Sequence, residues 1–190
     1  MITEYPSKER IYGYNPTTGE SEPIWKDNAT GSIVQIEIPH AAIHFGKYFS
    51  DTGKLTIANG ASFDHLLITP APGGKLVHLR LFLFAATSAP IYHYLYEDAT
   101  VSANGTAHSG ENFNRNFSSA TLGLYHAPTV TTTGTLIHTS GIIGTKQSGG
   151  AGETSGTEWV LKQNSKYLSR LTNNSGGSAD LIYVIEWYEL

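Results

Sequence analysis

The chain has 190 residues, 15% of them charged, a formal net charge of -4 at pH 7 and no cysteine. This length is enough for one domain with a substantial core. The acidic balance and the scattered basic residues argue against nucleic-acid binding, which needs clustered Lys and Arg. The lack of cysteine excludes disulfides, thiolate catalysis and cysteine-based zinc sites. The apolar runs are too short to span a membrane.

Residues 1–32 differ in composition from the rest of the chain. They contain three prolines and several turn signals, and no periodic run there is long enough to bury a face. Two interpretations stay open: a flexible leader that partly packs on its own domain, and an extended arm that docks on a neighbouring subunit. Aromatic side chains give large contact area at low entropic cost. The candidate contact residues of such an arm are Tyr5, Tyr12, Tyr14 and Trp25.

From residue 33 to residue 190, short β-like runs alternate with turn signals. Strands are expected at 33–38, 54–58, 62–69, 75–84, 91–96, 119–126, 135–143, 158–162, 167–172 and 179–188. The pair Asn59-Gly60 predicts a hairpin, residues 173–177 predict a terminal hairpin, and the turn at 88–90 predicts that its two flanking strands are adjacent.

The final run predicts one apolar face, made of Leu181, Tyr183, Ile185 and Trp187. Helical periodicity is weak, and the best candidate helix, at 40–49, has at most two or three turns. Many short strands without helix-length insertions predict an all-β fold, an antiparallel β-sandwich with an extended N-terminal arm. Among sandwich topologies we prefer the jelly roll.

The eight histidines raise the question of a metal site. His40 and His44 are four residues apart, but the sequence HAAIH lacks the Glu of the HExxH zinc signature. His93 stands alone in its strand, without a second ligand two residues away. We therefore expect structural histidines, no metal and no cofactor.

Catalytic motifs are absent from the sequence as well. There is no GxSxG elbow, and the glycine-rich runs lack both the GKS/T ending and a following helix. Glu97 and Asp98 are adjacent, so on a strand their carboxylates point to opposite faces. The sequence predicts a protein that is not an enzyme.

A few polar residues are candidates for structural networks. Arg170 shares a strand face with Leu168 and Thr172, and a half-buried Arg needs an acceptor, for which Glu97 and Glu186 are the candidates. The polar cluster of Asn112, Asn114, Arg115 and Asn116 predicts a loop that satisfies its own backbone. In both cases a contact with a ligand or partner is the alternative.

Three segments and the N-terminal region carry a resemblance to a known group of proteins. Residues 96–116 read YEDATVSANGTAHSGENFNRN, residues 124–144 read LYHAPTVTTTGTLIHTSGIIG, and residues 158–189 read EWVLKQNSKYLSRLTNNSGGSADLIYVIEWYE. The N-terminal IYGYNPTTGE is similar to a short YG-Y/W-D-G element of phage structural proteins. Together these segments resemble virion proteins of tailed bacteriophages.

The resemblance implies a β-sandwich virion component, with the nearest role that of a capsid decoration, or cement, protein. Such a protein binds the capsid exterior after synthesis in the host cytoplasm. Its implied partners are the major capsid protein and neighbouring copies of itself, so we expect a homo-oligomer that binds neither nucleic acid nor membrane. The alternative is a carbohydrate-binding or receptor-binding module of a tail or fibre. Its candidate aromatic residues are Tyr92, Tyr94, Trp159, Trp187 and Tyr188.

Overall fold

The computed structural model describes residues 12–14, 21–23, 38–143, 151–152 and 158–190. The chain divides into two compact units, Met1–Ile38 and Pro39–Leu190. In the first unit, β1 (Tyr12–Tyr14) pairs antiparallel with β2 (Ser21–Pro23). Tyr5, Trp25 and the predicted boundary after residue 32 lie outside the described residues, as does most of the strand expected at 33–38.

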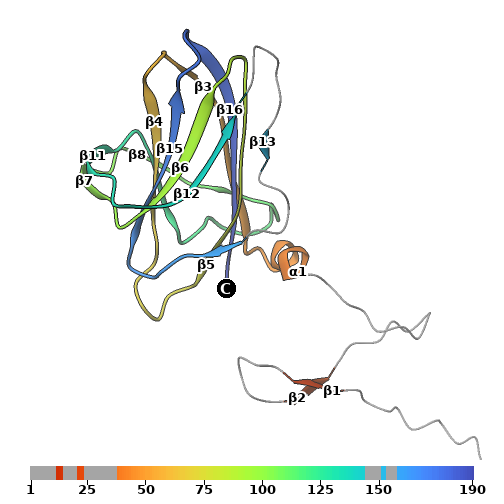
Figure 1. Ribbon diagram of the computed structural model, residues 1–190. Coiled ribbons are helices and arrows are strands. Elements are labelled where there is room, and N and C mark those ends of the chain that lie inside the picture. Colours follow the sequence, from red (N-terminus) through yellow and green to blue (C-terminus); the bar gives the residue numbers. More distant parts are fainter. Residues whose placement is uncertain (1–11, 15–20, 24–37, 144–150, 153–157) are drawn as a thin grey trace, which may run out of the picture. The chain divides into compact units, whose positions relative to one another are not determined.

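The second unit consists mainly of two antiparallel sheets that pack against each other, which confirms the predicted all-β sandwich (Figure 1). The β16 sheet has the order β13-β5-β16-β3-β9, and β14 also pairs with β5. Its strands are β3 (Tyr48–Ile57), β5 (Val77–Ala86), β9 (Glu111–Asn112), β13 (Ala151–Gly152), β14 (Trp159–Val160) and β16 (Ala179–Glu189).

The β15 sheet has the order β12-β6-β15-β4-β10-β8. Its strands are β4 (Ser62–Ile68), β6 (Ile91–Glu97), β8 (Thr106–His108), β10 (Gly123–His126), β12 (Thr135–Ile142) and β15 (Lys166–Asn173). A separate pair, β7 (Thr100–Ala103) with β11 (Thr129–Thr132), projects from the side of the sandwich (Figure 1).

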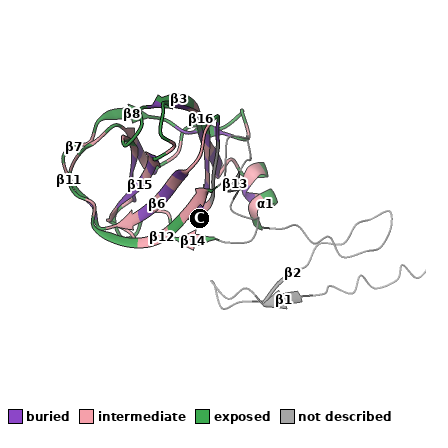
Figure 2. Ribbon diagram, turned by 45° about the horizontal axis from the view of Figure 1, so that its top comes forward, coloured by how far each residue is buried: buried purple, intermediate pink, exposed green. Residues whose placement is uncertain are grey.

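The core lies between the two sheets, as the alternation of buried and less buried residues along the strands shows (Figure 2). In β16 the predicted face is confirmed, because Leu181, Tyr183, Ile185 and Trp187 are all buried. The opposing sheet contributes Leu67, Leu95, Leu124, Tyr167 and Leu171, among others, to the same cluster. Burial of these alternating side chains is the main term that stabilises the fold.

The predicted helix is present but starts earlier and is shorter than expected. Helix α1 (Ile38–His44) makes about two turns and lies at the same end of the sandwich as the C-terminus (Figure 1). Its Ala42 is buried against Tyr48 and Tyr188, which form a small second core. None of the helices in the described ranges is long and apolar enough to cross a membrane.

The positions of the strands along the chain were predicted more accurately than the neighbours that each strand has in its sheet. The turns at 59–60, 88–90 and 173–177 were expected to join neighbouring strands, but each one connects a strand of one sheet to a strand of the other. Gly60 has the φ of +74° expected of an Asn-Gly turn, so the position of this turn was predicted correctly. The strand expected at 54–58 starts earlier, because β3 also includes residues 51–53, which pair with β16.

Asn173 connects two of these turns, the one at 59–60 and the one at 173–177, through hydrogen bonds. Its buried side-chain amide donates to the carbonyl oxygens of Ile57 (2.7 Å) and Gly177 (2.8 Å) and accepts from the Ser175 N–H (2.9 Å). The Gly60 N–H donates to the Asn173 carbonyl (2.7 Å). The buried side chain of Asn173 therefore bonds to the backbone at the end of β3, before the 59–60 turn, and to the backbone of the 173–177 turn.

We predict that Asn173→Ala destabilises the protein by about 2–4 kcal/mol, because two carbonyls and one N–H lose their partner. Asn173→Asp should cost more, since it places a carboxylate oxygen against those carbonyls. The neighbouring Asn174 is exposed, so Asn174→Ala should change stability by less than about 0.5 kcal/mol. Urea unfolding followed by circular dichroism measures all three. Equal effects at both positions would contradict this role of Asn173.

Candidate functional site

Asp51, His108 and His126 form a cluster that joins the two sheets, here called the His–Asp cluster. Asp51 lies in β3 of the β16 sheet, and its side chain is only 4% exposed. His108 and His126 lie in β8 and β10, which pair with each other in the β15 sheet. The cluster is therefore assembled from opposite layers of the sandwich, at the side where β8 ends the β15 sheet.

The carboxylate of Asp51 bridges the two imidazoles. Its Oδ2 lies 2.8 Å from His126 Nε2, and its Oδ1 lies 3.2 Å from His108 Nδ1. The two rings stack with centroids 3.8 Å apart and an interplanar angle of 20°. Each carboxylate oxygen thus faces one ring nitrogen, and the two rings are fixed relative to each other.

Tyr183 supports the cluster from β16. Its hydroxyl lies 3.4 Å from His126 Nε2. Gly53 is the cross-strand partner of Tyr183, and a Cβ at position 53 would lie 2.6 Å from the Tyr183 hydroxyl oxygen. Glycine at this position therefore makes room for the phenol ring beside the cluster.

The pKa values of Asp51 and of two residues beside the cluster, Tyr183 and His65, are shifted. Burial alone would raise the pKa of the Asp51 carboxyl, but the hydrogen bond with His126 and the nearby imidazoles lower it below its usual value. Burial, together with the charge of Asp51 and a hydrogen bond to it, raises the pKa of the Tyr183 hydroxyl. Burial lowers the pKa of His65, whose ring centroid lies 4.9 Å from that of His126, to about 3. Asp51 is therefore ionised at neutral pH, while His65 and Tyr183 stay uncharged.

An open pocket of about 300 Å³ lies against the cluster. Six residues line it: Asp51, Thr52, Ala107, His108, Ser109 and Glu111. Two members of the cluster thus face a space that a small ligand can enter. His126 is less accessible, with 14% of its side chain exposed against 43% for His108.

Arg170 makes a different ion pair from the one predicted. Its Nε and Nη2 donate to the two oxygens of Asp64, at 2.7 and 2.8 Å. The prediction of Glu97 or Glu186 as its partner was wrong, because Asp64 lies directly opposite Arg170 in the β15–β4 register. Such a bidentate, half-buried pair fixes the register of two strands.

Glu97 and Glu186 bond elsewhere. Glu97 accepts from Lys162 Nζ (2.5 Å) and from the Tyr167 hydroxyl (2.8 Å), and the hydrogen bond from Lys162 contributes most to lowering its pKa. Glu186 belongs to the other sheet, where its Oε2 accepts from the Tyr48 hydroxyl (2.8 Å). Both residues therefore have structural roles in separate networks.

The asparagine-rich loop is bonded to itself and to its neighbours. Asn112 donates to the carbonyls of Gly46 and Ser118, both at 2.9 Å, and accepts from the Asn114 N–H. Asn114 in turn donates to the carbonyl of His44 (3.0 Å). Arg115 pairs with Glu111, which lines the pocket of the His–Asp cluster.

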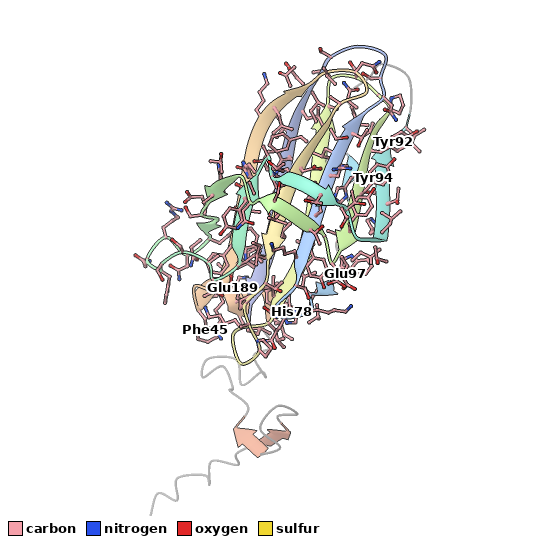
Figure 3. The ribbon with its side chains drawn as sticks, turned by 90° about the vertical axis from the view of Figure 1, so that its left-hand side faces the viewer. Phe45, His78, Tyr92, Tyr94, Glu97 and Glu189 are labelled. Atoms are coloured by element: carbon pink, nitrogen blue, oxygen red, sulfur yellow. The ribbon has the colours of Figure 1, made fainter. Side chains whose placement is uncertain are left out.

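Three exposed phenylalanines surround the corner between α1 and β3, and we call them the phenylalanine patch. Phe45, Phe113 and Phe117 are 67%, 44% and 52% exposed. Phe113 packs edge-on against Tyr48, with centroids 4.9 Å apart, and Phe117 lies against Gly46. Figure 3 shows Phe45 at the same end of the sandwich as Glu189.

A row of tyrosines follows the outer face of β6. Tyr92, Tyr94 and Tyr96 alternate with the buried Ile91, His93 and Leu95. Their successive ring centroids are 6.2 Å apart. Figure 3 shows Tyr92 and Tyr94 at the end of the sandwich opposite Phe45.

The other aromatic candidates for a sugar platform differ in exposure. Trp187 and Tyr188 are buried, at 0% and 2%, so proposing them as platform residues was wrong. Trp187 belongs to the main core between the sheets, and Tyr188 belongs to the small second core that includes Ala42 of α1. Trp159 is partly buried and packs against the core.

The histidines considered in the sequence lie outside the His–Asp cluster. His40 and His44 contact each other on α1, with Nε2 atoms 3.0 Å apart. His93 is buried, and its ring nitrogens lie 3.3 Å from Ser140 Oγ and 3.1 Å from Ser169 Oγ. The sequence analysis missed the cluster itself, because its three members are distant in the chain and match no local spacing motif. No local pattern links His108, in the run TAHSG, with His126, at the end of the run GLYH.

No family model matches the chain, and no curated protein matches its sequence. The functional proposal therefore depends on the residues of this chain and on the physical properties of its surfaces.

We predict that Gly53→Ala destabilises the protein by about 1–3 kcal/mol, because the added methyl group overlaps the buried Tyr183 ring. As a matched control, a Cβ at Gly177 has no atom within 4 Å, so Gly177→Ala should leave stability unchanged or slightly higher. Thermal unfolding compares the two variants. Indistinguishable unfolding midpoints would show that Tyr183 does not need the space at position 53.

Proposed function

We propose that this chain is a non-enzymatic structural protein of a bacteriophage virion: a capsid decoration, or cement, protein. It binds the exterior of the head and stabilises contacts between major capsid subunits. The observation that carries the proposal is the phenylalanine patch, since a group of exposed aromatic side chains marks a surface for a protein partner. The resemblance of the sequence to tailed-phage virion proteins supplies the identity of that partner.

The surroundings of the patch favour binding because they are already ordered. Asn112 and Asn114 connect the loop that carries Phe113 and Phe117 to the backbone at His44 and Gly46. Tyr48, beneath Phe113, is held by Glu186. A surface fixed in this way loses little conformational entropy when a partner covers it.

The N-terminal unit supplies the second contact in this proposal. Tyr12 and Tyr14 belong to the β1–β2 pair, and with Tyr5 and Trp25 they are the aromatic residues through which the arm binds a neighbouring copy or the capsid. Copies of the chain then form a homo-oligomer on the shell. Two weak contacts per copy, repeated over a capsid, give strong attachment through multivalency.

We also infer that the sandwich is a jelly roll. Four strands of one sheet follow the order β3-β16-β5-β13, and four of the other follow β4-β15-β6-β12. The chain passes from sheet to sheet between β3, β4, β5 and β6, and again between β13, β15 and β16. Jelly rolls occur in viral capsid proteins and in lectins, so this topology is compatible with both candidate functions.

We predict that the full-length protein co-sediments with empty capsids of its phage, and that Phe45→Ser combined with Phe117→Ser weakens this binding by about 30-fold or more. The reason is that buried aromatic anchors each contribute about 2 kcal/mol or more to such interfaces. Binding is measured by titrating capsids and quantifying the protein in the pellet.

Ile182→Ser is the matched control, because Ile182 is 56% exposed but lies on β16, outside the patch. It should leave capsid binding unchanged. A variant with serine at Tyr5, Tyr12, Tyr14 and Trp25 tests the arm in the same assay. Full binding by the double phenylalanine variant would contradict the role of the patch, and full binding by the arm variant would contradict the role of the arm.

The tyrosine row favours a second candidate function, carbohydrate binding in a tail or fibre device. Arg170, paired with Asp64, is the direct neighbour of Tyr94 in the β15–β6 register. Thr172, bonded to Ser62 (2.8 Å), is the neighbour of Tyr92. Half-exposed aromatic rings beside fixed polar groups provide stacking surfaces and hydrogen-bonding partners for a sugar.

If the tyrosine row binds a glycan, a glycan array should show specific binding at micromolar affinity, and Tyr94→Ala should reduce it by about 10-fold or more. The double phenylalanine variant serves as the control, since Phe45 lies away from Tyr92 and Tyr94 (Figure 3) and Phe117 lies against Gly46, next to Phe45 in the chain. An array without signal for the wild-type protein would remove this candidate and leave capsid adhesion as the function.

A further inference from the structure

We propose that the His–Asp cluster binds a divalent transition-metal ion, with zinc as the best match. Asp51, His108 and His126 each offer one ligand atom, and these atoms all lie within 4.8 Å of one another. The inference does not depend on the proposed function, because it rests on different residues from the phenylalanine patch and the tyrosine row.

The distances between the donor atoms are close to those of a metal site. Nitrogen and oxygen ligands lie about 2.0–2.2 Å from zinc, so in a tetrahedral site they lie about 3.3 Å from each other. Asp51 Oδ1 and His108 Nδ1 are 3.2 Å apart, and Asp51 Oδ2 and His126 Nε2 are 2.8 Å apart. Separations that are a few tenths of an ångström larger would accommodate the ion, with small side-chain rotations.

The donor set selects the class of metal. Two imidazoles and one carboxylate suit zinc and its neighbours in the first transition row, whereas calcium and magnesium prefer oxygen ligands alone. Asp51 supplies the negative charge, and its burial keeps it in place. No thiolate competes for the ion, because the chain contains no cysteine.

Three protein ligands leave a coordination position open. The pocket of about 300 Å³ lies on the side of Asp51 and His108, so this position faces solvent. Water or a small anionic ligand can occupy it, as in zinc sites with three protein ligands. Glu111 also lines the pocket, with its carboxylate paired to Arg115.

The surrounding structure positions the ligands before the metal arrives. Asp51 is fixed within β3, where it is paired with Ile185 of β16. Two residues further along β3, Gly53 leaves space for the Tyr183 side chain. The His126 ring is packed edge-on by His65 and Phe63, with centroids 4.9 and 5.9 Å away. A site built on strands of a rigid sandwich requires little reorganisation on binding.

Because the ligands come from opposite sheets, a bound ion would also connect the two layers. Metal binding to the folded state alone raises apparent stability by mass action. We therefore expect zinc to raise the midpoint of thermal unfolding, by an amount that grows with zinc concentration.

The test uses the full-length chain without an affinity tag, stripped with EDTA and dialysed. Isothermal titration with zinc chloride in a non-chelating buffer should show one ion per chain. His108→Ala should weaken the affinity at least about 100-fold, since even second-shell substitutions weaken metal affinity by 10–100-fold. His108→Ala removes one of the two imidazoles that face the buried Asp51, so the unfolding midpoint of this variant in EDTA should fall slightly. Circular dichroism in EDTA should show that the variant is folded at the temperature of the titration. Asp51→Asn, nearly isosteric, should give the same loss of affinity.

The matched control removes the other close pair of histidines. His40 and His44 lie on α1 with their Nε2 atoms 3.0 Å apart, and His40→Ala with His44→Ala should leave the titration unchanged. The proposal is overturned if the wild-type protein binds no zinc, if His108→Ala and Asp51→Asn bind it as tightly as wild type, or if the α1 double variant abolishes binding.

Discussion

The central pairing of β16 is the constraint on which the rest of the molecule depends. This strand pairs with β3 on one side and with β5 on the other, along most of its length. Its inward side chains include Trp187, which is fully buried and stacks on Phe49 with centroids 5.8 Å apart. β16 pairs with β3 in a single register from Ala179 to Tyr188, and this register determines the position of its inward side chains.

Features far apart on the surface are held by this same strand. Tyr183 places its hydroxyl beside the His–Asp cluster, and Glu186 holds Tyr48 beneath the phenylalanine patch. Near its end, the buried carboxylate of Glu189 accepts hydrogen bonds from the N–H groups of Thr121 and Leu122. A slip of one residue in β16 would turn these side chains to the other face and remove all three supports together.

The alternation of apolar residues made the fold class and most strands predictable, because side-chain burial follows the period of the strand. Pairing was not predictable, since a turn such as Asn59-Gly60 fixes the local backbone but not the sheet that the next strand joins. The predicted partner of Arg170 was wrong for the same reason. Asp64 lies opposite it only because β4 and β15 are neighbours, and no local pattern indicates that they are.

The His–Asp cluster likewise leaves no local pattern in the sequence, because the pairing of the sheets brings its members together. Motif searches find ligands that a helix or hairpin brings together, whereas Asp51 meets His108 and His126 only across the completed sandwich. A buried carboxylate between two sheets carries a desolvation cost that the two imidazoles offset. An ion bound at this position would replace these hydrogen bonds with coordinate bonds from the same three side chains to the metal. Zinc affinity would therefore depend on correct packing of the two sheets.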